Sequence, residues 1–416
     1  MTVKHHDVVA LGEEIESMGM RKWLMRELAW AFREARKNKL KTFNEHQYEV
    51  NWMENVAKLT DAIMERTYKP SGSVSFIIYD PMVREIFAAP FIDRVVHHFL
   101  YEICGGWWDR HFIYDSYSCR DDKGTLLGIL RVQKMMRRAS ENLTKDAYVV
   151  KLDIKGYFMS LPRKELYEEV KWGLDQQFGA DLDQKGVYDL YKLCIYLWRM
   201  VLLDDPVQKS YRRGPLRNWN DLPPEKSLYT RDPGLGIVIG NLTSQLVSNI
   251  YLNRLDRYIK YDLGYQYYGR YVDDFVIIVP ADKYAQLLKD IKKIEKFLRV
   301  ELRMVLHKKK RYVQHVKKGV NFLGARVYPY CIYPSNRVQS KFREELRKYL
   351  KYGQNQEKLT SYMGLIRHMD AGKFVKREFD KYGLDFDLFL ESESEDRRSF
   401  DEILWELRER VAGVWG

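Results

Sequence analysis

The stretch Tyr271-Val272-Asp273-Asp274-Phe275 lies between two runs rich in β-branched and aromatic residues, 267–270 and 276–279. Such runs are typical of strands, and adjacent carboxylates are rare inside strands because burying charge is costly unless it is paired or binds metal. A β-hairpin resolves this conflict, since its arms can pack into a core while the acids lie at the turn. The pattern therefore predicts two strands within 266–279. A plain Asp-Asp hairpin turn without a catalytic role is the alternative.

A second strand with an acid near its end is predicted at 147–154, Ala-Tyr-Val-Val-Lys-Leu-Asp-Ile. Two metal ions about 3.5–4 Å apart need bridging carboxylates. Magnesium prefers hard oxygen ligands and leaves positions open for phosphates. Carboxylates from two adjacent strands can supply this arrangement. Asp153, Asp273 and Asp274 are therefore candidate ligands of two Mg²⁺ ions, for which Mn²⁺ could substitute.

Basic residues outnumber acidic ones in the 416-residue chain, 70 Lys and Arg against 58 Asp and Glu, a formal charge of +12. This excess indicates a polyanionic partner such as nucleic acid. A soluble protein with a charged surface is the alternative. The four cysteines form no C-x-x-C pair, so we expect neither a zinc site nor a disulfide framework, which fits a reducing cytoplasm.

No targeting or membrane segment is predicted. Residues 1–13 carry charges without an apolar core, unlike a signal peptide. No apolar run approaches the roughly 18 residues that a membrane helix needs. We therefore expect a cytoplasmic protein without a membrane partner.

Apolar spacing predicts the order of the remaining elements. Extended segments are expected at 73–90 and 304–334, and a Pro- and Gly-rich loop at 204–236, where such length usually signals function or an insertion. An acidic link is expected at 391–396. Helical segments are expected at 14–70, 91–104, 162–203, 242–262, 283–301, 336–379 and 398–413.

The motifs together resemble those of reverse transcriptases, in family order, over about residues 75–375. Tyr271 to Asp274 looks like the Tyr-x-Asp-Asp signature, with Tyr271 at the nucleotide. Asp153 looks like the first catalytic acid, and the resemblance implies that the Ile154 carbonyl contacts a metal. Phe158, five residues after Asp153, would be the steric gate that rejects the ribose 2′-hydroxyl. A core aromatic is the alternative for Phe158.

A Gly-rich segment, 234–245, resembles the family's template- and nucleotide-contacting motif, with Gly240, Ser244 and Gln245 at the nucleotide. Read alone, it is a helix start capped by Asn241 or Thr243. The Ser-Gln ending is similar to that of diversity-generating retroelement enzymes and of several prokaryotic defence-associated groups.

Basic residues occur in three further motifs. Arg84 and Arg120, with Lys123, would clasp the incoming triphosphate, because guanidinium groups match phosphate oxygens. Lys310, with Lys309 as its rival, would protonate the leaving pyrophosphate. Surface salt bridges or a solvated face are the alternatives.

Two late segments also match the family. Residues 322–324, Phe-Leu-Gly, look like the primer-grip turn, and residues 360–368 resemble the thumb. The resemblance also implies that four basic residues between these two segments meet the template–primer backbone: Arg343, Arg347, Lys348 and Lys351.

The resemblance implies an α+β fold, the right-hand polymerase with fingers, palm and thumb and an antiparallel palm sheet. The expected parts are an N-terminal helical region (1–72), fingers (73–140), palm (141–334, with an insertion at 204–236), and thumb with a helical extension (335–416).

The implied activity is RNA-directed DNA polymerisation: dNTPs are joined into cDNA on a non-coding RNA template, in anti-phage defence. Error-prone copying in a diversity-generating retroelement and an inactive RNA-binding scaffold are the alternatives. An accessory protein or homo-oligomer would be compatible with each of these.

Overall fold

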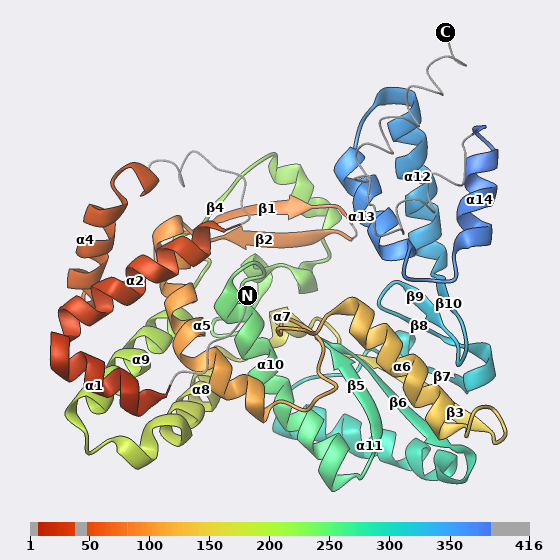
Figure 1. The fold of residues 1–416 in the computed structure, drawn as a ribbon, viewed down its shortest axis with the longest axis horizontal. Coiled ribbons are helices and arrows are strands. Elements are labelled where there is room, and N and C mark those ends of the chain that lie inside the picture. The colour runs from red at the N-terminus through yellow and green to blue at the C-terminus, as the bar shows by residue number, and fades with distance from the viewer. Residues whose placement is uncertain (1–6, 38–47, 81, 384–416) are drawn as a thin grey trace. The chain divides into compact units, whose positions relative to one another are not determined.

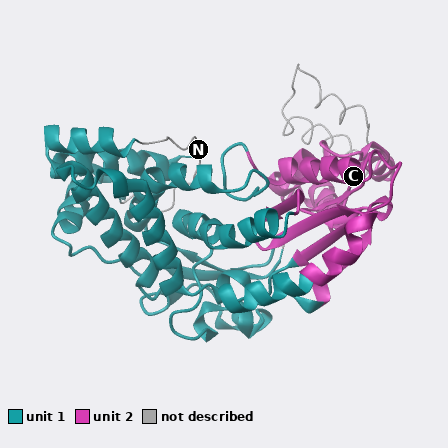
Figure 2. Ribbon diagram, turned by 90° about the horizontal axis from the view of Figure 1, so that it is seen from below, with its two compact units in different colours: residues 1–122, 153–264, 291–308 teal, residues 123–152, 265–290, 309–416 magenta. Residues whose placement is uncertain are grey.

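The computed structural model describes residues 7–37, 48–80 and 82–383 (Figure 1). The acidic link at 391–396 and the helix at 398–413 lie outside these residues. Two compact units are coloured in Figure 2: unit 1 has residues 1–122, 153–264 and 291–308, and unit 2 has residues 123–152, 265–290 and 309–416. The domain boundaries given above stay a prediction.

Helices dominate unit 1, where apolar residues at helical spacing form buried stripes, as Trp23, Leu24 and Leu28 do. Helix α2 packs on α4 and α5, α9 packs on α1 and α8, and α10 packs on α5 and α8. The predicted helical segments of this unit are confirmed by α1 Val8–Met18, α2 Met20–Arg36, α4 Trp52–Met64, α5 Phe91–His111, α8 Arg163–Phe178, α9 Lys185–Leu203 and α10 Leu242–Arg257, which a π-helical turn extends over Tyr258–Asp262. The short helix α7, Tyr157–Ser160, was not predicted.

A small sheet of order β2-β1-β4 also belongs to unit 1. Strands β1 (Val74–Ile78) and β2 (Arg84–Ala88) pair antiparallel, as expected for 73–90. Strand β4 (Tyr211–Arg212) pairs parallel with β1, with Tyr211 opposite Val74. The segment 204–236 is thus only partly the loop that we predicted. Strand β4 has only two residues, too few to show the alternation of apolar and polar side chains that predicts a strand.

Buried Glu85 of β2 fastens this insertion to the sheet. Its carboxylate accepts hydrogen bonds from Trp219 Nε1 (2.7 Å), Ser227 Oγ (2.8 Å) and the Leu228 amide (2.7 Å). Because an unpaired buried carboxylate would be costly, these donors satisfy it only if the insertion stays folded. The insertion is therefore an integral part of the sheet's buried face.

The main sheet of unit 2 has the order β5-β6-β3-β7. Strands β5 (Tyr267–Tyr271) and β6 (Asp274–Pro280) form an antiparallel hairpin, and β3 (Ala147–Asp153) pairs antiparallel with β7 (Tyr312–His315). Helix α6 (Thr125–Ala139) packs on β5 and β6 (Figure 1). Helix α11 (Tyr284–Glu301) follows β6. The two strands predicted within 266–279 and the strand at 147–154 are confirmed.

A second sheet and three C-terminal helices complete the described part of unit 2. The sheet has the order β10-β9-β8, with β8 Val320–Phe322, β9 Ala325–Val327 and β10 Ile332–Pro334. Leu323 and Gly324 join β8 to β9 with positive φ angles of 50° and 85°. Helices α12 (Asn336–Tyr352), α13 (Gln356–Ile366) and α14 (Gly372–Asp380) bury a common core around Phe342, Met363 and Val375.

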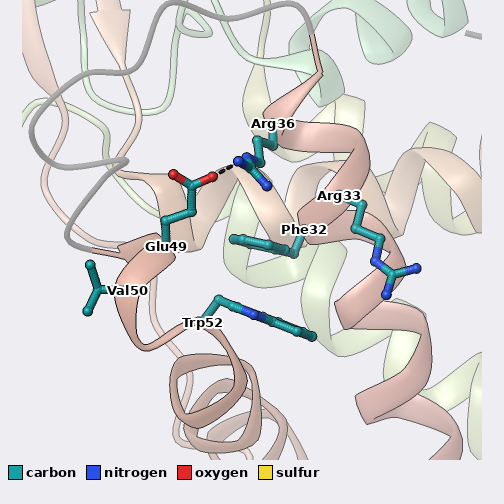
Figure 3. A pocket seen from close by; sticks show the side chains of 6 residues that line it. All are labelled: Phe32, Arg33, Arg36, Glu49, Val50 and Trp52. Atoms are coloured by element: carbon teal, nitrogen blue, oxygen red, sulfur yellow. Dashed lines mark ion pairs between the residues drawn. The ribbon is translucent and has the colours of Figure 1, made fainter.

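A pocket of about 360 Å³ in the helical layer of unit 1 holds none of the predicted site residues (Figure 3). Phe32 stacks on Trp52 at 5.3 Å between ring centroids, and Arg36 pairs with Glu49 at its rim. Within the described ranges, every helix is too short or too polar to span a bilayer.

Candidate active site

The hairpin of β5 and β6 carries the predicted acid pair at its tip. Tyr271 pairs with Asp274, so Val272 and Asp273 form a two-residue turn. The arm behind it is apolar and buried from Phe275 to Val279, whereas Asp273 and Asp274 are only partly buried. The fold therefore leaves both acidic residues partly accessible at the tip of the hairpin, with Oδ1 of Asp274 buried.

The turn is strained at Val272, whose φ is 53°. Glycine normally takes a positive-φ position in hairpin turns, and a β-branched residue there costs about 1–3 kcal/mol. Arg270, which is completely buried, donates from Nη1 to the Val272 carbonyl at 3.0 Å. A hydrogen bond from a charged donor contributes about 1.5–3 kcal/mol, comparable to the strain.

The strand that ends in Asp153 is the neighbour of β6 in the sheet. Lys151 of β3 forms an ion pair with Asp274 at 3.0 Å, and the Ala281 amide donates to the Asp146 carbonyl at 2.9 Å near the opposite strand ends. The two contacts show that β3 and β6 run antiparallel. The C-terminal end of β3 and the Asp273–Asp274 turn therefore lie at the same edge of the sheet.

Carboxylates of this kind suit magnesium, because it binds hard oxygen ligands. Among the residues that the structure describes, no three His, Cys, Asp or Glu side chains gather closely enough to hold a metal ion. Asp274 is instead engaged by Lys151, which supplies positive charge at the acids. Metal binding by Asp153, Ile154, Asp273 and Asp274 stays a prediction.

The backbone beyond Asp153 is fixed within unit 1. The His307 amide donates to the Asp153 carbonyl at 2.8 Å, and the Lys155 amide donates to the Val305 carbonyl at 2.8 Å. Ile154 is buried and forms an isolated bridge with Leu306. The chain therefore enters α7, which carries Phe158, along a defined path.

Phe158 and the Gly-rich segment lie together in unit 1. The Phe158 carbonyl accepts a hydrogen bond from the Ile237 amide at 3.0 Å, and its half-buried ring contacts Tyr157 edge-on. Tyr157 in turn donates to the Ser248 carbonyl of α10 at 2.5 Å. The residue predicted as the gate is thus attached to the segment predicted to contact the nucleotide.

The backbone conformation at position 240 requires glycine. Its φ is 130°, and an added Cβ would lie 3.1 Å from the Phe87 carbonyl oxygen. Asn241 occupies the N-cap position of α10 but makes no side-chain capping bond. Ser244 is buried and Gln245 half-buried in the first turn of α10.

Thr243 bonds His97 instead of capping the helix, at 2.9 Å between Oγ1 and Nδ1. Burial, and then the neighbouring His98 and Arg94, lower the pKa of His97 to about 3, so its ring is neutral at physiological pH. A cavity of about 60 Å³ lies beside this pair, lined also by Asp93, Arg163 and Ser244.

The guanidinium of Arg120 lies in the interior of unit 1. Its guanidinium pairs with Asp109 at 2.6 Å and also donates to the carbonyls of Ile113 (2.7 Å), Ser116 (3.1 Å) and Asp109 (3.1 Å). Its side chain is 6% exposed. These contacts use its N–H groups and favour a structural role, so its nucleotide role stays an untested prediction.

The other basic candidates are accessible. Arg84 is exposed at the start of β2, and Lys123 is half-exposed ahead of α6. Lys310 ends an exposed 3₁₀ turn, Lys308–Lys310, and Lys309 is equally exposed, so the structure does not choose between them.

Sequence reasoning missed Arg270, Lys151 and Glu85. A charged residue inside an otherwise apolar strand was the available signal for the first two, at Gly269-Arg270-Tyr271 and Val150-Lys151-Leu152. Glu85 gave no such signal, because its partners lie more than a hundred residues away.

The chain belongs to the family Reverse transcriptase (RNA-dependent DNA polymerase), whose model matches residues 91–327, more than half of its length. Family membership, together with the antiparallel sheet that carries the acids, confirms the predicted α+β right-hand polymerase fold.

Solved structures similar to this chain include two telomerases. One is telomerase from Candida albicans in complex with a TWJ fragment of telomeric RNA, at 12% identity and a TM-score of 0.41, covering 88% of this chain and 66% of that one. The other is apo telomerase from Candida tropicalis, at 11% identity and a TM-score of 0.44, covering 83% and 64%. The chain therefore spans less than two thirds of either telomerase. No curated protein matches it.

Proposed function

We propose that this protein is a magnesium-dependent RNA-directed DNA polymerase. The observation that carries the proposal is the Asp273–Asp274 turn beside the end of β3, in a chain of the reverse transcriptase family. Asp153, Asp273, Asp274 and the Ile154 carbonyl would hold two Mg²⁺ ions. When bound, these ions would activate the primer 3′-hydroxyl and neutralise charge on the triphosphate.

The chain's own side chains would select and orient the nucleotide. Phe158 would exclude a 2′-hydroxyl, and its attachment to the Gly-rich segment supports a shared nucleotide site for Gly240, Ser244 and Gln245. Tyr271 would lie at the same nucleotide. Exposed Arg84 and half-exposed Lys123 would contact the triphosphate, and Lys310 would donate a proton to the departing pyrophosphate.

The template would be a cognate non-coding RNA, whose phosphates would meet α12. Arg347 and Lys351 are exposed there, whereas Arg343 pairs with Glu378 and Lys348 pairs with Glu344. Exposed cations that are not already neutralised by carboxylates supply the stronger phosphate contacts. Arg347 and Lys351 are therefore the best candidates.

The biological use that we propose is anti-phage defence, in the lineage that shares the Ser244-Gln245 ending. The alternative is cDNA synthesis in a diversity-generating retroelement, which the same ending fits. The insertion at 204–236 supports the defence assignment, because it is built into a sheet of unit 1 and lengthens the chain beyond a minimal enzyme.

The test is to purify the full chain with its co-expressed native RNA, add Mg²⁺ and all four dNTPs, and sequence any DNA. The Asp273→Ala, Asp274→Ala double variant is the matched control, and its RNA binding is measured separately. We expect DNA that maps to one bound RNA and is absent from the variant. Repeats with scattered mutations in that DNA would favour diversification over defence.

Two results would contradict the proposal. DNA synthesis at the wild-type rate by the double variant would remove the acids from the mechanism. Tight RNA binding without DNA synthesis, on that RNA or on a generic primed template, would make the inactive scaffold the better description.

A further inference from the structure

Arg270 is a charged side chain in the interior of the catalytic hairpin. It lies in β5 opposite Phe275, and both residues are completely buried, as is Tyr268. A guanidinium taken out of water loses its hydration, and an apolar side chain of similar volume would pack there more cheaply. Arg270 therefore calls for a role that an apolar side chain could not fill.

One contact of Arg270 is with the turn that carries the acids. Its Nη1 donates to the carbonyl of Val272 at 3.0 Å. Val272 is the one turn residue with a positive φ, and its branched side chain disfavours that conformation. A relaxed turn would rotate the following peptide and redirect the carboxylates of Asp273 and Asp274.

The adjacent strand holds the same turn from its other side. Lys151 pairs with Asp274 at 3.0 Å, and both side chains are partly buried. The strained peptide and one of its acids are thus each held by a cation from a rigid strand. Sites built on strands and supported by buried partners keep their ligands closer to the binding geometry than sites on unsupported loops.

We propose that Arg270 is a positioning residue: through its bond to the Val272 carbonyl it keeps the Asp273–Asp274 turn in the conformation that binds the divalent metal. This inference rests on the proposed function. It distinguishes Arg270 from an ordinary core residue, because removing Arg270 should affect metal binding more than stability alone explains, and relaxing Val272 should compensate.

The experiment measures Mn²⁺ binding to the full-length protein by electron paramagnetic resonance, alongside thermal unfolding. Arg270→Met removes the donor and keeps much of the volume. Ile277→Ala, at a completely buried position of β6 opposite Tyr268, is the control for a weakened core. We expect Arg270→Met to weaken Mn²⁺ binding about tenfold or more. Ile277→Ala should lower the unfolding temperature while the Mn²⁺ affinity stays at the wild-type value.

The second comparison tests the mechanism. Val272→Gly removes the penalty of a positive φ, so the double variant Arg270→Met, Val272→Gly should recover most of the lost Mn²⁺ affinity. Should Arg270→Met fail to fold, Arg270→Lys, which lacks the planar fork, replaces it in both comparisons.

The outcomes separate the inference from the proposed function. Wild-type affinity in Arg270→Met, or a double variant no better than the single one, would overturn the positioning role and leave the polymerase assignment intact. A wild-type protein that binds no Mn²⁺ and makes no DNA would overturn both.

Discussion

Several charged side chains of this protein lie where most proteins place apolar ones. The side chains of Arg120, Arg270 and Glu85 are almost entirely buried, and each is bonded to backbone groups or to a side chain far away in the sequence. A buried charge is tolerated only with such partners, so each one specifies a particular arrangement of the chain around it. For Arg120, these structural contacts are an alternative to the nucleotide-binding role that the motif predicts.

Arg120→Lys separates these two roles. A lysine cannot reproduce the fork that holds Asp109 and three carbonyls, so we expect a loss of about 1–3 kcal/mol in the free energy of unfolding. The KM for dNTPs should stay near the wild-type value. Urea unfolding and steady-state kinetics measure the two quantities. A raised KM for dNTPs with an unchanged free energy of unfolding would instead support triphosphate binding by Arg120.

Phe158 controls sugar selection if its ring faces the nucleotide. Phe158→Ala should then raise incorporation of ribonucleotides relative to deoxyribonucleotides by about 10- to 100-fold, because a lost steric contact admits the extra hydroxyl. Competitive primer extension with both nucleotides measures the ratio, and Phe158→Tyr, which keeps the bulk, is the control. Unchanged discrimination in Phe158→Ala would leave it as a packing residue.

His97 makes the fold sensitive to acid. Its folded pKa of about 3 lies below its unfolded value, so protons bind the unfolded chain first and stability falls as the pH drops from about 6.5 toward 3. Between pH 7 and 5 we expect a loss on the order of 1–2 kcal/mol from this residue. His97→Gln should show a smaller loss in urea unfolding at the two pH values. An identical pH dependence in both proteins would contradict the assignment.

Among strands and helices, the insertion at 204–236 is held by the pairing of β4 with β1 and by the buried carboxylate of Glu85. Glu85→Gln replaces one acceptor oxygen by an amide that cannot accept, and should cost about 1–3 kcal/mol. Amides of residues 207–230 should exchange with deuterium faster than in the wild type. Glu225→Gln removes the same charge from an exposed position of the insertion and should leave exchange unchanged. Equal exchange in both variants would mean that Glu85 does not hold the segment.

The elements that the sequence predicted are those with a local signature. The hairpin of β5 and β6 shows two runs of β-branched and aromatic residues around its acids, and α11 shows a regular amphipathic spacing, so both were predictable. Strand β4 and the anchor at Glu85 depend on residues more than a hundred positions away, which no local pattern encodes. Likewise, Asp153 and the acid pair were recognisable from the sequence as metal-ligand types. The role that we propose for Arg270 was not, because it depends on the strained turn at Val272, which no sequence pattern shows.

For the molecule as a whole, the formal charge of +12 suggests salt-dependent binding to RNA. Each phosphate contact to a single strand contributes about 0.7 to the slope of log affinity against log salt. Arg347→Gln with Lys351→Gln should therefore reduce the slope by roughly 1.4. Arg343→Gln is the control, because that guanidinium is less exposed and already pairs with Glu378. Filter binding across salt concentrations measures the slopes, and equal slopes in all three proteins would remove α12 from the interface.

The parallel pairing of β4 with β1 has a consequence for the order in which the protein forms. Val74 pairs with Tyr211, so the third strand of this sheet is synthesised 137 residues after the first. Domains generally fold as they emerge during synthesis, and long-range pairing of this kind closes slowly. While α5 to α9 are being translated, β1 therefore lacks its neighbour β4. The carboxylate of Glu85 lacks its hydrogen-bond donors during the same period. During that interval β1 has an unpaired strand edge, which is the kind of surface that invites pairing with another chain.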